Sequence, residues 1–389
     1  MFVMKVLSSL ALISFFCMSL STAQQTQSYE WKHPGMFIDK AEIEAIKELV
    51  SAKKKPWITA YQTLMEDAGH ALHSPVLSVV NQGPDQDNMN KYLTESPYCG
   101  WDPETSPCGR ECCDGHFNPD SDRSDYEVAI KLGNAVRNLG LAYALTGEAK
   151  YADKALSFMR TWTIDPETRM VPRFTTSQSY IELYITIPGM FYGADLMWNY
   201  EGWPRDEKTA FLEWTKDITL DAAGRRHNNN FENWRVGFVM AGAVLTEDEH
   251  LMKEAIAHFK ENIEDQVGPD GSMVHELRRT NSLDYSLYAV LAMIQAAETA
   301  RHYGEDLYSY RSSDQRGLEL ILDYHAPYAS GLEEWPFEQI TEYDGDNAWV
   351  YEFGYSTFRK PAYKAVLNHW GRPMYDRRNM GPITLTHGK

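Results

Sequence analysis

Positive charge is scarce in this chain. Its 389 residues include 37 lysine and arginine residues against 55 aspartate and glutamate residues, giving a formal net charge of −18. A protein that binds nucleic acid needs a positive field, so this balance argues against that class of partner. No glycine-rich phosphate-binding pattern occurs in a suitable context, and nothing in the sequence requires a cofactor or a metal.

Long apolar runs are also missing beyond the N-terminus, so no membrane span is expected. The N-terminus itself has Lys5, then an apolar stretch, then small residues at Ser21 and Ala23 before a cleavage point. This order is typical of a secretion signal, which we predict over residues 1–23. A short membrane anchor is the alternative. The expected location of the mature protein is therefore secreted or periplasmic.

Cysteine is rare, and the cysteines beyond the signal are Cys99, Cys108, Cys112 and Cys113. An even number in an exported chain favours disulfides. A bond between the adjacent Cys112 and Cys113 would strain the backbone, which leaves two pairings of these with Cys99 and Cys108. A zinc site is the alternative, but paired C-x-x-C spacing is absent. We expect the disulfides to stiffen a long irregular loop over about 71–123.

Helical periodicity is what the chain has in abundance. Asp39 and Glu42 give a capping signal, and Pro56 opens a second helix. Further helices are expected over 124–146, 150–162, 180–199, 204–224, 231–245, 247–266, 282–303, 312–326 and 355–370. Because the connections are mostly short, neighbouring helices should be antiparallel.

The expected fold class is all-α, with few short strands. No linker divides the chain, so we predict a single domain over 24–389, built of helix hairpins that close into an α/α toroid. An open solenoid is the alternative, but no fixed-period repeat is present. The best strand candidate lies around 272–277. The sequence says nothing of oligomeric state.

Two polar segments interrupt the helical pattern. Residues 225–235 read RRHNNNFENWR, and residues 276–286 read ELRRTNSLDYS. Asparagines are good helix caps, but capping explains only one or two of the three in succession. In the second segment, Arg279 precedes a predicted helix and Tyr285 lies inside it. An ordinary solvated turn and an ordinary core tyrosine are the plain interpretations of these two segments.

Both segments resemble motifs of the polysaccharide lyases that carry an alginate-lyase domain and fold as α/α toroids. The family's Asn-Asn-His motif, with an aromatic residue three positions after the histidine, is similar to NNFENW at 229–234. Its second motif, Glu-Leu-Ala-Arg-Thr-x-Ser-x-x-Tyr, is similar to ELRRTNSLDY at 276–285. Polysaccharide lyase family 38 is the nearest resemblance, and it extends over most of the mature chain.

One position departs from the family pattern. Phe231 stands where the family has histidine, and a phenyl ring cannot accept a proton. Either a neighbouring histidine replaces it, with His227 and His275 the nearest in sequence, or Tyr285 does the proton work alone.

The resemblance implies cleavage of a uronate-containing polysaccharide by β-elimination. The C5 proton becomes acidic only when the neighbouring carboxylate is neutralised, a task for amide donors and a cation. Asn230, Arg279, Tyr285 and His227 are the expected catalytic residues. The expected substrate-binding residues are Asn229, Asn233, Trp234, Arg226, Arg278 and His275.

Tyr285 is the expected proton carrier, with Arg279 favouring its phenolate form. In mannuronate and glucuronate, H5 and O4 lie on one side of the ring, so one tyrosine can serve as base and then as acid. We therefore expect alginate rich in mannuronate as the substrate, with glucuronan the nearest rival. An acidic polymer needs a local positive groove, which we predict from Arg225, Arg226, Arg235, Arg278 and Arg279.

Two other classes remain open. A glycoside hydrolase on the same architecture would use two carboxylates, and Asp125, Glu127 and Glu182 are candidates that no motif pairs. A glycan-binding protein without catalysis is the other class, because Phe231 removes the family histidine.

Overall fold

The computed structural model describes residues 29–81 and 90–389, so the predicted secretion signal lies outside the described residues. Within them, no helix combines the length and the apolar character needed to cross a membrane. The helices are α1 (Lys40–Ser51), α2 (Trp57–His73), α3 (Ser124–Thr146), α4 (Ala149–Met159), α5 (Ser177–Tyr184), α6 (Ile187–Leu196), α7 (Arg205–Ala223), α8 (Asn230–Thr246), α9 (Glu249–Gln266), α10 (Ser282–Arg301), α11 (Leu318–Ala329), α12 (Val350–Phe358), α13 (Pro361–Trp370) and α14 (Ile383–His387). A π-helical turn, Arg160–Ile164, continues α4.

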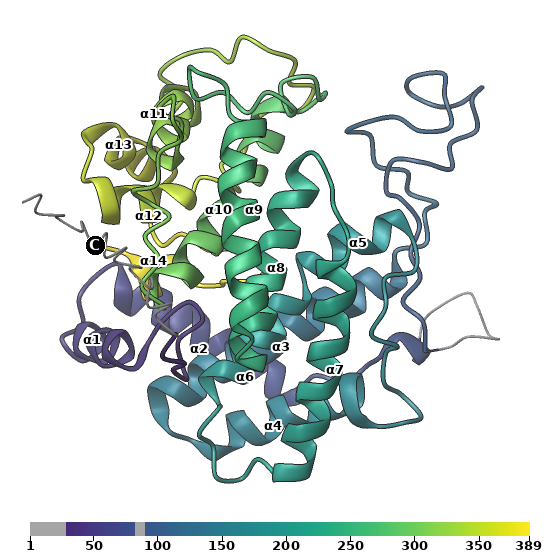
Figure 1. Ribbon diagram of the computed structural model, residues 1–389, viewed down its shortest axis with the longest axis vertical. Coiled ribbons are helices and arrows are strands. Elements are labelled where there is room, and N and C mark those ends of the chain that lie inside the picture. Colours follow the sequence, from purple (N-terminus) through teal and green to yellow (C-terminus); the bar gives the residue numbers. More distant parts are fainter. Residues whose placement is uncertain (1–28, 82–89) are drawn as a thin grey trace, which may run out of the picture.

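Neighbouring helices pack side by side, and the chain folds back from one helix to the next. The resulting architecture is an α/α toroid (Figure 1). α8 packs against α7, α9 and α10, while α3 packs against α4 and α6. Nearly every residue of α8 and α10 is buried, which identifies them as core helices without a solvent face. The C-terminal helix α14 returns to α1 and α2 and so brings the two ends of the described chain together. The predicted all-α toroid is confirmed.

Local signals account for several helix starts. The predicted capping box of α1 is present: Asp39 accepts from the backbone N–H of Glu42, and Glu42 accepts from that of Asp39, both at 2.9 Å. α9 begins after a simple N-cap, Asp248, whose carboxylate accepts from Leu251 N–H at 3.0 Å.

Two predicted helices are each divided in the structure. The segment expected to be one helix over 180–199 forms α5 and α6, because Pro188 lacks the N–H that a continuous helix needs. The segment expected over 355–370 forms α12 and α13, which meet at Arg359 in a left-handed conformation just before Pro361. The expected strand around 272–277 is wrong, because that segment makes only an isolated bridge followed by turns.

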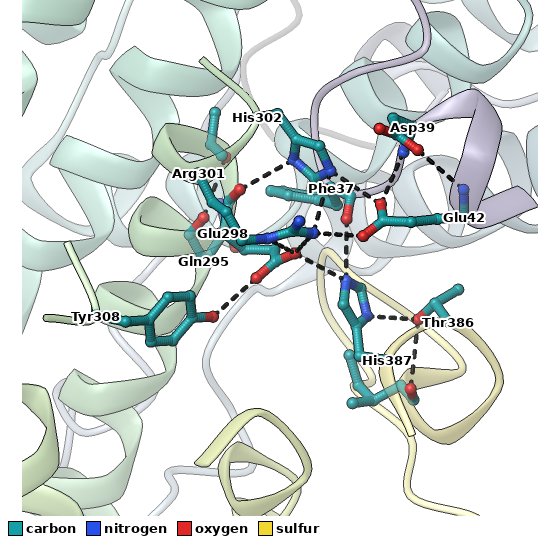
Figure 2. Close-up of polar contacts among 12 residues, drawn as sticks. Phe37, Asp39, Glu42, Gln295, Glu298, Arg301, His302, Tyr308, Thr386 and His387 are labelled. Atoms are coloured by element: carbon teal, nitrogen blue, oxygen red, sulfur yellow. Dashed lines mark hydrogen bonds and ion pairs between the residues drawn. The ribbon is translucent and has the colours of Figure 1, made fainter. Parts of the chain in front are cut away.

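A partly buried polar cluster joins α1 to α10 and to the C-terminal helix α14 (Figure 2). His302 Nε2 lies 2.9 Å from a carboxylate oxygen of Glu42, and Arg301 lies 2.6 Å from the other oxygen of that carboxylate. Arg301 also donates to the buried Glu298 at 2.9 Å, and His387 Nε2 lies 2.9 Å from the carbonyl of Phe37. His387 Nε2 also lies 3.5 Å from Glu298, so polar contacts join both α1 and α14 to the C-terminal end of α10.

Acid should weaken this cluster. His302 and Arg301 lower the pKa of Glu42 from 4.5 to about 2, although burial opposes the shift. A carboxylate with a depressed pKa in the folded state stabilises the fold above its unfolded pKa, and this stability is lost as the pH falls through the folded value. We expect the unfolding free energy to fall between about pH 4.5 and about pH 2. Glu42→Gln should reduce that fall by roughly 1–2 kcal/mol after solvent screening, measured by urea denaturation at each pH. An unchanged pH dependence would contradict this role for Glu42.

Among the described residues, Asp39, Glu42 and His302 are the one group whose ligand atoms lie close enough to share a metal ion. The oxygens of Asp39 and Glu42 already serve the capping box, and Arg301 lies 2.6 Å from Glu42. A guanidinium at this distance repels a cation, so the group is a structural ion-pair cluster.

Candidate active site

The two polar motifs meet in one cleft of about 600 Å³. Asn230 and Phe231 begin α8, Arg279 precedes α10, and Tyr285 lies in the first turns of α10; all four line the cleft. The sequence predicted that these two segments act together, and the structure brings them to one place. Their chemical roles depend on the contacts described next.

Tyr285 donates its hydroxyl hydrogen to the hydroxyl of Tyr98 at 2.7 Å. The guanidinium of Arg279 covers the ring of Tyr285, with its central carbon 3.6 Å from the ring centroid. Burial raises the pKa of Tyr285 well above 10, and the Arg279 charge only partly offsets this. Arg279 therefore acts in the expected direction, favouring the phenolate, although burial outweighs its effect in the resting site.

Arg279 is fixed by two carboxylates. Its Nε lies 3.0 Å from Asp114, which also accepts from the backbone N–H of Thr280 at 3.1 Å. A second guanidinium nitrogen lies 3.6 Å from Glu276. These charges hold the guanidinium flat against Tyr285, and they leave it less free to bind an anion than an unpaired arginine would be.

Asn230 is buried, with 1% of its surface exposed, and both its backbone N–H and its side-chain amide donate to Glu276, at 3.0 and 2.9 Å. Its side-chain oxygen has no partner within the described part of the chain. Burial raises the pKa of Glu276 above its usual value. An amide carries two N–H groups, so one donor of Asn230 is left for a ligand in the cleft.

Two further cleft arginines were not predicted. Arg123 forms an ion pair with Glu182 at 2.9 Å. Arg378 lies with its guanidinium carbon 4.8 Å from the ring centroid of Tyr288, and it makes no ion pair with any residue that the structure describes. Arg378 is therefore the cleft cation best able to receive an anionic ligand. Arg378 lies far along the chain from both motifs and belongs to no recognisable pattern, so no sequence signal could have identified it.

The cysteine-bearing loop forms one wall of the cleft. Its disulfides are Cys99–Cys112 and Cys108–Cys113, one of the two pairings that the sequence left open. Tyr98, immediately before the first cysteine, lines the cleft. Asp114, immediately after the last cysteine, provides the carboxylate that binds Arg279. The loop is thus part of the site as well as a stiffened surface segment.

Several predicted site residues lie elsewhere. His227 does not line the cleft; its ring lies 5.8 Å from that of Phe231 and its Nε2 is 3.4 Å from the hydroxyl of Tyr184. Burial lowers the pKa of His227, and its ring packs edge-on against that of Phe231 outside the cleft lining. His275 is also absent from the cleft lining. Neither histidine takes the place of the family histidine in this geometry.

The helix α8 turns its other motif residues into the interior. Asn233 is buried and its amide bonds to Gln266 at 2.9 Å, so the structure gives it no contact with substrate. Trp234 is buried against Tyr288, with ring centroids 5.0 Å apart, and supports the cleft from behind. Asn229 caps α8 by accepting from Phe231 N–H at 3.2 Å. All three residues make structural contacts, and none of them lines the cleft.

The prediction of a positive groove is wrong. Of its five arginines, only Arg279 lines the cleft. Arg225 pairs with Asp221 at 3.0 Å, Arg226 pairs with Glu232 and Glu261 at 2.9 Å, Arg235 is buried beside Glu232, and Arg278 is exposed on the surface.

The cleft lining is of mixed charge. Its cations are Arg123, Arg279 and Arg378, and its acids are Glu182, Asp284, Glu342, Asp344 and Asp346. Burial raises the pKa of Asp284 to about 6, so this carboxyl group holds its proton more readily than usual. An acidic polymer must therefore bind through particular contacts, since the cleft offers no uniform positive field.

The carboxylates proposed for a hydrolase do not form a pair. Glu182 lines the cleft, but it is held by Arg123 and by the hydroxyl of Tyr92 at 2.7 Å. Asp125 is buried and accepts from Leu93 N–H at 2.7 Å. Neither Asp125 nor Glu127 lines the cleft. The geometry gives no support to two-carboxylate hydrolysis by this set.

A helical toroid whose cleft gathers an amide, a guanidinium and a phenol is the arrangement expected of the polysaccharide lyases that the two motifs resemble. The sequence model described as alginate lyase matches residues 78–335, more than half of the chain. The chain therefore belongs to the alginate lyase family.

Solved structures agree with this assignment. An alginate lyase from Bacteroides ovatus is 25% identical, with a TM-score of 0.79 over 92% of this chain and 100% of that one. Alginate lyase A1-III from Sphingomonas species A1 is 18% identical, with a TM-score of 0.66 over 92% of this chain and 98% of that one, which shows a shared fold. A curated polysaccharide lyase from Stenotrophomonas maltophilia is 34% identical over 89 residues, and the match spans 27% of that relative's length.

Proposed function

We propose that this protein is a polysaccharide lyase that cleaves a polyuronate by β-elimination. The observation that carries the proposal is the meeting of Asn230, Arg279 and Tyr285 in one cleft. Alginate is the expected polymer, because the similar structure from Bacteroides ovatus is an alginate lyase. Two disulfides favour an oxidising compartment, so we place the protein outside the cytoplasm.

The first requirement of the reaction is to neutralise the sugar carboxylate next to C5. Arg378 offers a cation that forms no direct ion pair among the described residues, although Asp376 and Asp346 act on its charge, and Asn230 keeps one amide N–H that no described residue accepts. Donors that are already oriented stabilise the negative charge that develops as the C5 proton leaves, at no reorganisation cost. In this proposal Arg378 and Asn230 bind the carboxylate, while Arg279 acts mainly on Tyr285.

The second requirement is proton transfer. Tyr285 must first lose its hydroxyl proton to solvent; its phenolate oxygen then takes the proton from C5, the C4–O4 bond breaks to leave a C4–C5 double bond, and the same proton is delivered to O4, which regenerates the phenolate. Burial makes the phenolate costly, so it must be stabilised at the moment it forms. Arg279 supplies a positive charge against the ring, and Tyr98 can turn its hydroxyl to donate to the phenolate oxygen.

One tyrosine can perform both transfers only when H5 and O4 lie on the same side of the sugar. This holds for mannuronate and glucuronate and fails for guluronate. The absence of His227 and His275 from the cleft lining leaves no second base of that type, and this supports a preference for mannuronate. Glucuronan shares the same geometry and remains the rival substrate.

The proposal is tested by incubating the purified protein with mannuronate-rich alginate, guluronate-rich alginate and glucuronan. A lyase produces an unsaturated sugar end, so ultraviolet absorbance should rise together with reducing ends, and fastest on mannuronate-rich alginate. Reducing ends without absorbance would mean hydrolysis instead. Binding without either signal would mean a glycan-binding protein, and both of these outcomes would overturn the proposal.

A further inference from the structure

The side chain of Phe117 is 70% exposed, yet it lies in the lining of the cleft. A single exposed apolar residue is ordinary on a protein surface and by itself implies nothing. What distinguishes Phe117 is its position in the disulfide-bonded wall of the candidate active site. Its phenyl ring remains available to whatever occupies the cleft.

The backbone around Phe117 is held firmly although its ring is free. The N–H of His116 donates to the carbonyl of Cys113 at 3.1 Å, and the N–H of Asn118 donates to that of Pro97 at 2.6 Å. The side chain of Asn118 also donates to the carbonyl of Cys99 at 2.8 Å. Both disulfides lie in the same loop, so the ring is presented from a backbone that is already ordered. Preorganisation of this kind lowers the entropic cost of binding a ligand.

Phe117 also connects directly to the reactive end of the cleft. Its ring lies 5.3 Å from that of Tyr98, tilted by 53°. The hydroxyl of Tyr98 in turn accepts the hydrogen bond from Tyr285. Tyr98 therefore links the proposed proton carrier, through a hydrogen bond, to an exposed ring of the cleft wall.

We propose that Phe117 is the platform of an outer sugar subsite, where a pyranose ring of the polysaccharide stacks its C–H face on the phenyl ring. This inference rests on the proposed function, because it takes the cleft to hold a polysaccharide. Contact between an apolar sugar face and an aromatic ring needs no charge. It therefore suits a cleft whose lining includes Glu342, Asp344 and Asp346, which repel the carboxylates of a polyuronate.

The subsite is tested with purified mannuronate oligosaccharides of increasing length. Phe117→Ala should leave kcat/KM unchanged for the shortest oligosaccharide that is cleaved. It should lower kcat/KM for longer ones by roughly tenfold, mainly through KM, because only they reach the outer ring. Phe117→Tyr keeps an aromatic face and should retain the wild-type length dependence. Phe337→Ala is a matched control, since Phe337 is 39% exposed and lies outside the cleft lining.

The possible outcomes separate the two proposals. If the wild-type protein forms no unsaturated product from any polyuronate, the proposed function fails whatever Phe117 does. If product forms and Phe117→Ala matches the wild type at every length, the subsite is refuted. The subsite is also refuted if Phe117→Ala lowers kcat/KM equally at every oligosaccharide length, or if Phe337→Ala has the same effect as Phe117→Ala. Because the side chain is exposed, the melting temperature of Phe117→Ala should stay close to that of the wild type.

Discussion

Tyr285→Phe is expected to lower kcat on mannuronate-rich alginate by about 10³-fold or more. The substitution removes one oxygen, the atom proposed to carry the proton from C5 to O4, and general acid–base groups typically contribute about 10²–10⁴-fold. The ring remains in place under Arg279, and the only side-chain hydrogen bond lost among the described residues is the one to Tyr98. KM should therefore change little. Initial rates of absorbance increase, measured at saturating substrate, give the comparison.

Two measurements show whether a lower kcat comes from the lost hydroxyl or from a folding defect. The melting temperature of Tyr285→Phe should stay within a few degrees of the wild-type value, because one hydrogen bond contributes only about 1 kcal/mol. Tyr355→Phe removes a phenol that does not line the cleft and should keep full activity. A folded Tyr285→Phe protein that releases unsaturated product at the normal rate would exclude the proposed role.

The sequence was a good guide to the elements whose signals are local. The capping box at Asp39 and Glu42 forms as predicted, and the expected helix over 124–146 matches α3. Breaks inside helices were missed at Pro188 and Pro361. Every residue of α6 is buried, so it shows no periodicity from which a boundary could be predicted.

The site was predictable only where a motif carried it. Asn230, Arg279 and Tyr285 are all in the cleft. Asn233 was expected there because it shares a helix face with Asn230, but α8 is buried along nearly its whole length, so only its first turn reaches the cleft. Tyr98 comes from a loop that is distant in sequence and approaches the motif only in the folded chain.

The charge prediction failed for a related reason. Counting arginines near the motifs ignored carboxylates that neutralise them locally, such as Asp221 one helical turn before Arg225. It also missed Asp114, which reaches Arg279 from the cysteine loop. Net charge and composition give the number of charged side chains but not which of them form ion pairs. The ion pairs decide which arginine is free to bind a ligand.

Arg279→Met is expected to lower kcat by about 10²–10³-fold, the usual effect of removing one preorganised charge from a site where charge develops. The loss follows from two contacts, the guanidinium 3.6 Å from the centroid of the Tyr285 ring and the ion pair that Asp114 makes with it. Arg279→Lys keeps the charge but cannot reproduce the planar contact, so an intermediate rate is expected. Arg278→Met is the matched control, because Arg278 is exposed and does not line the cleft.

The pH dependence of kcat in these variants shows whether Arg279 acts through its charge or through its packing against Tyr285. Arg279 lowers the pKa of Tyr285 against the larger effect of burial, so removing its charge must raise that pKa further. A base with a higher pKa is deprotonated only at higher pH, so the rising limb of kcat against pH should shift to higher pH in Arg279→Met. It should stay near the wild-type position in Arg279→Lys and Arg278→Met. A rising limb that does not move in Arg279→Met, in a protein with a normal melting temperature, would show that Arg279 does not act on the phenol of Tyr285.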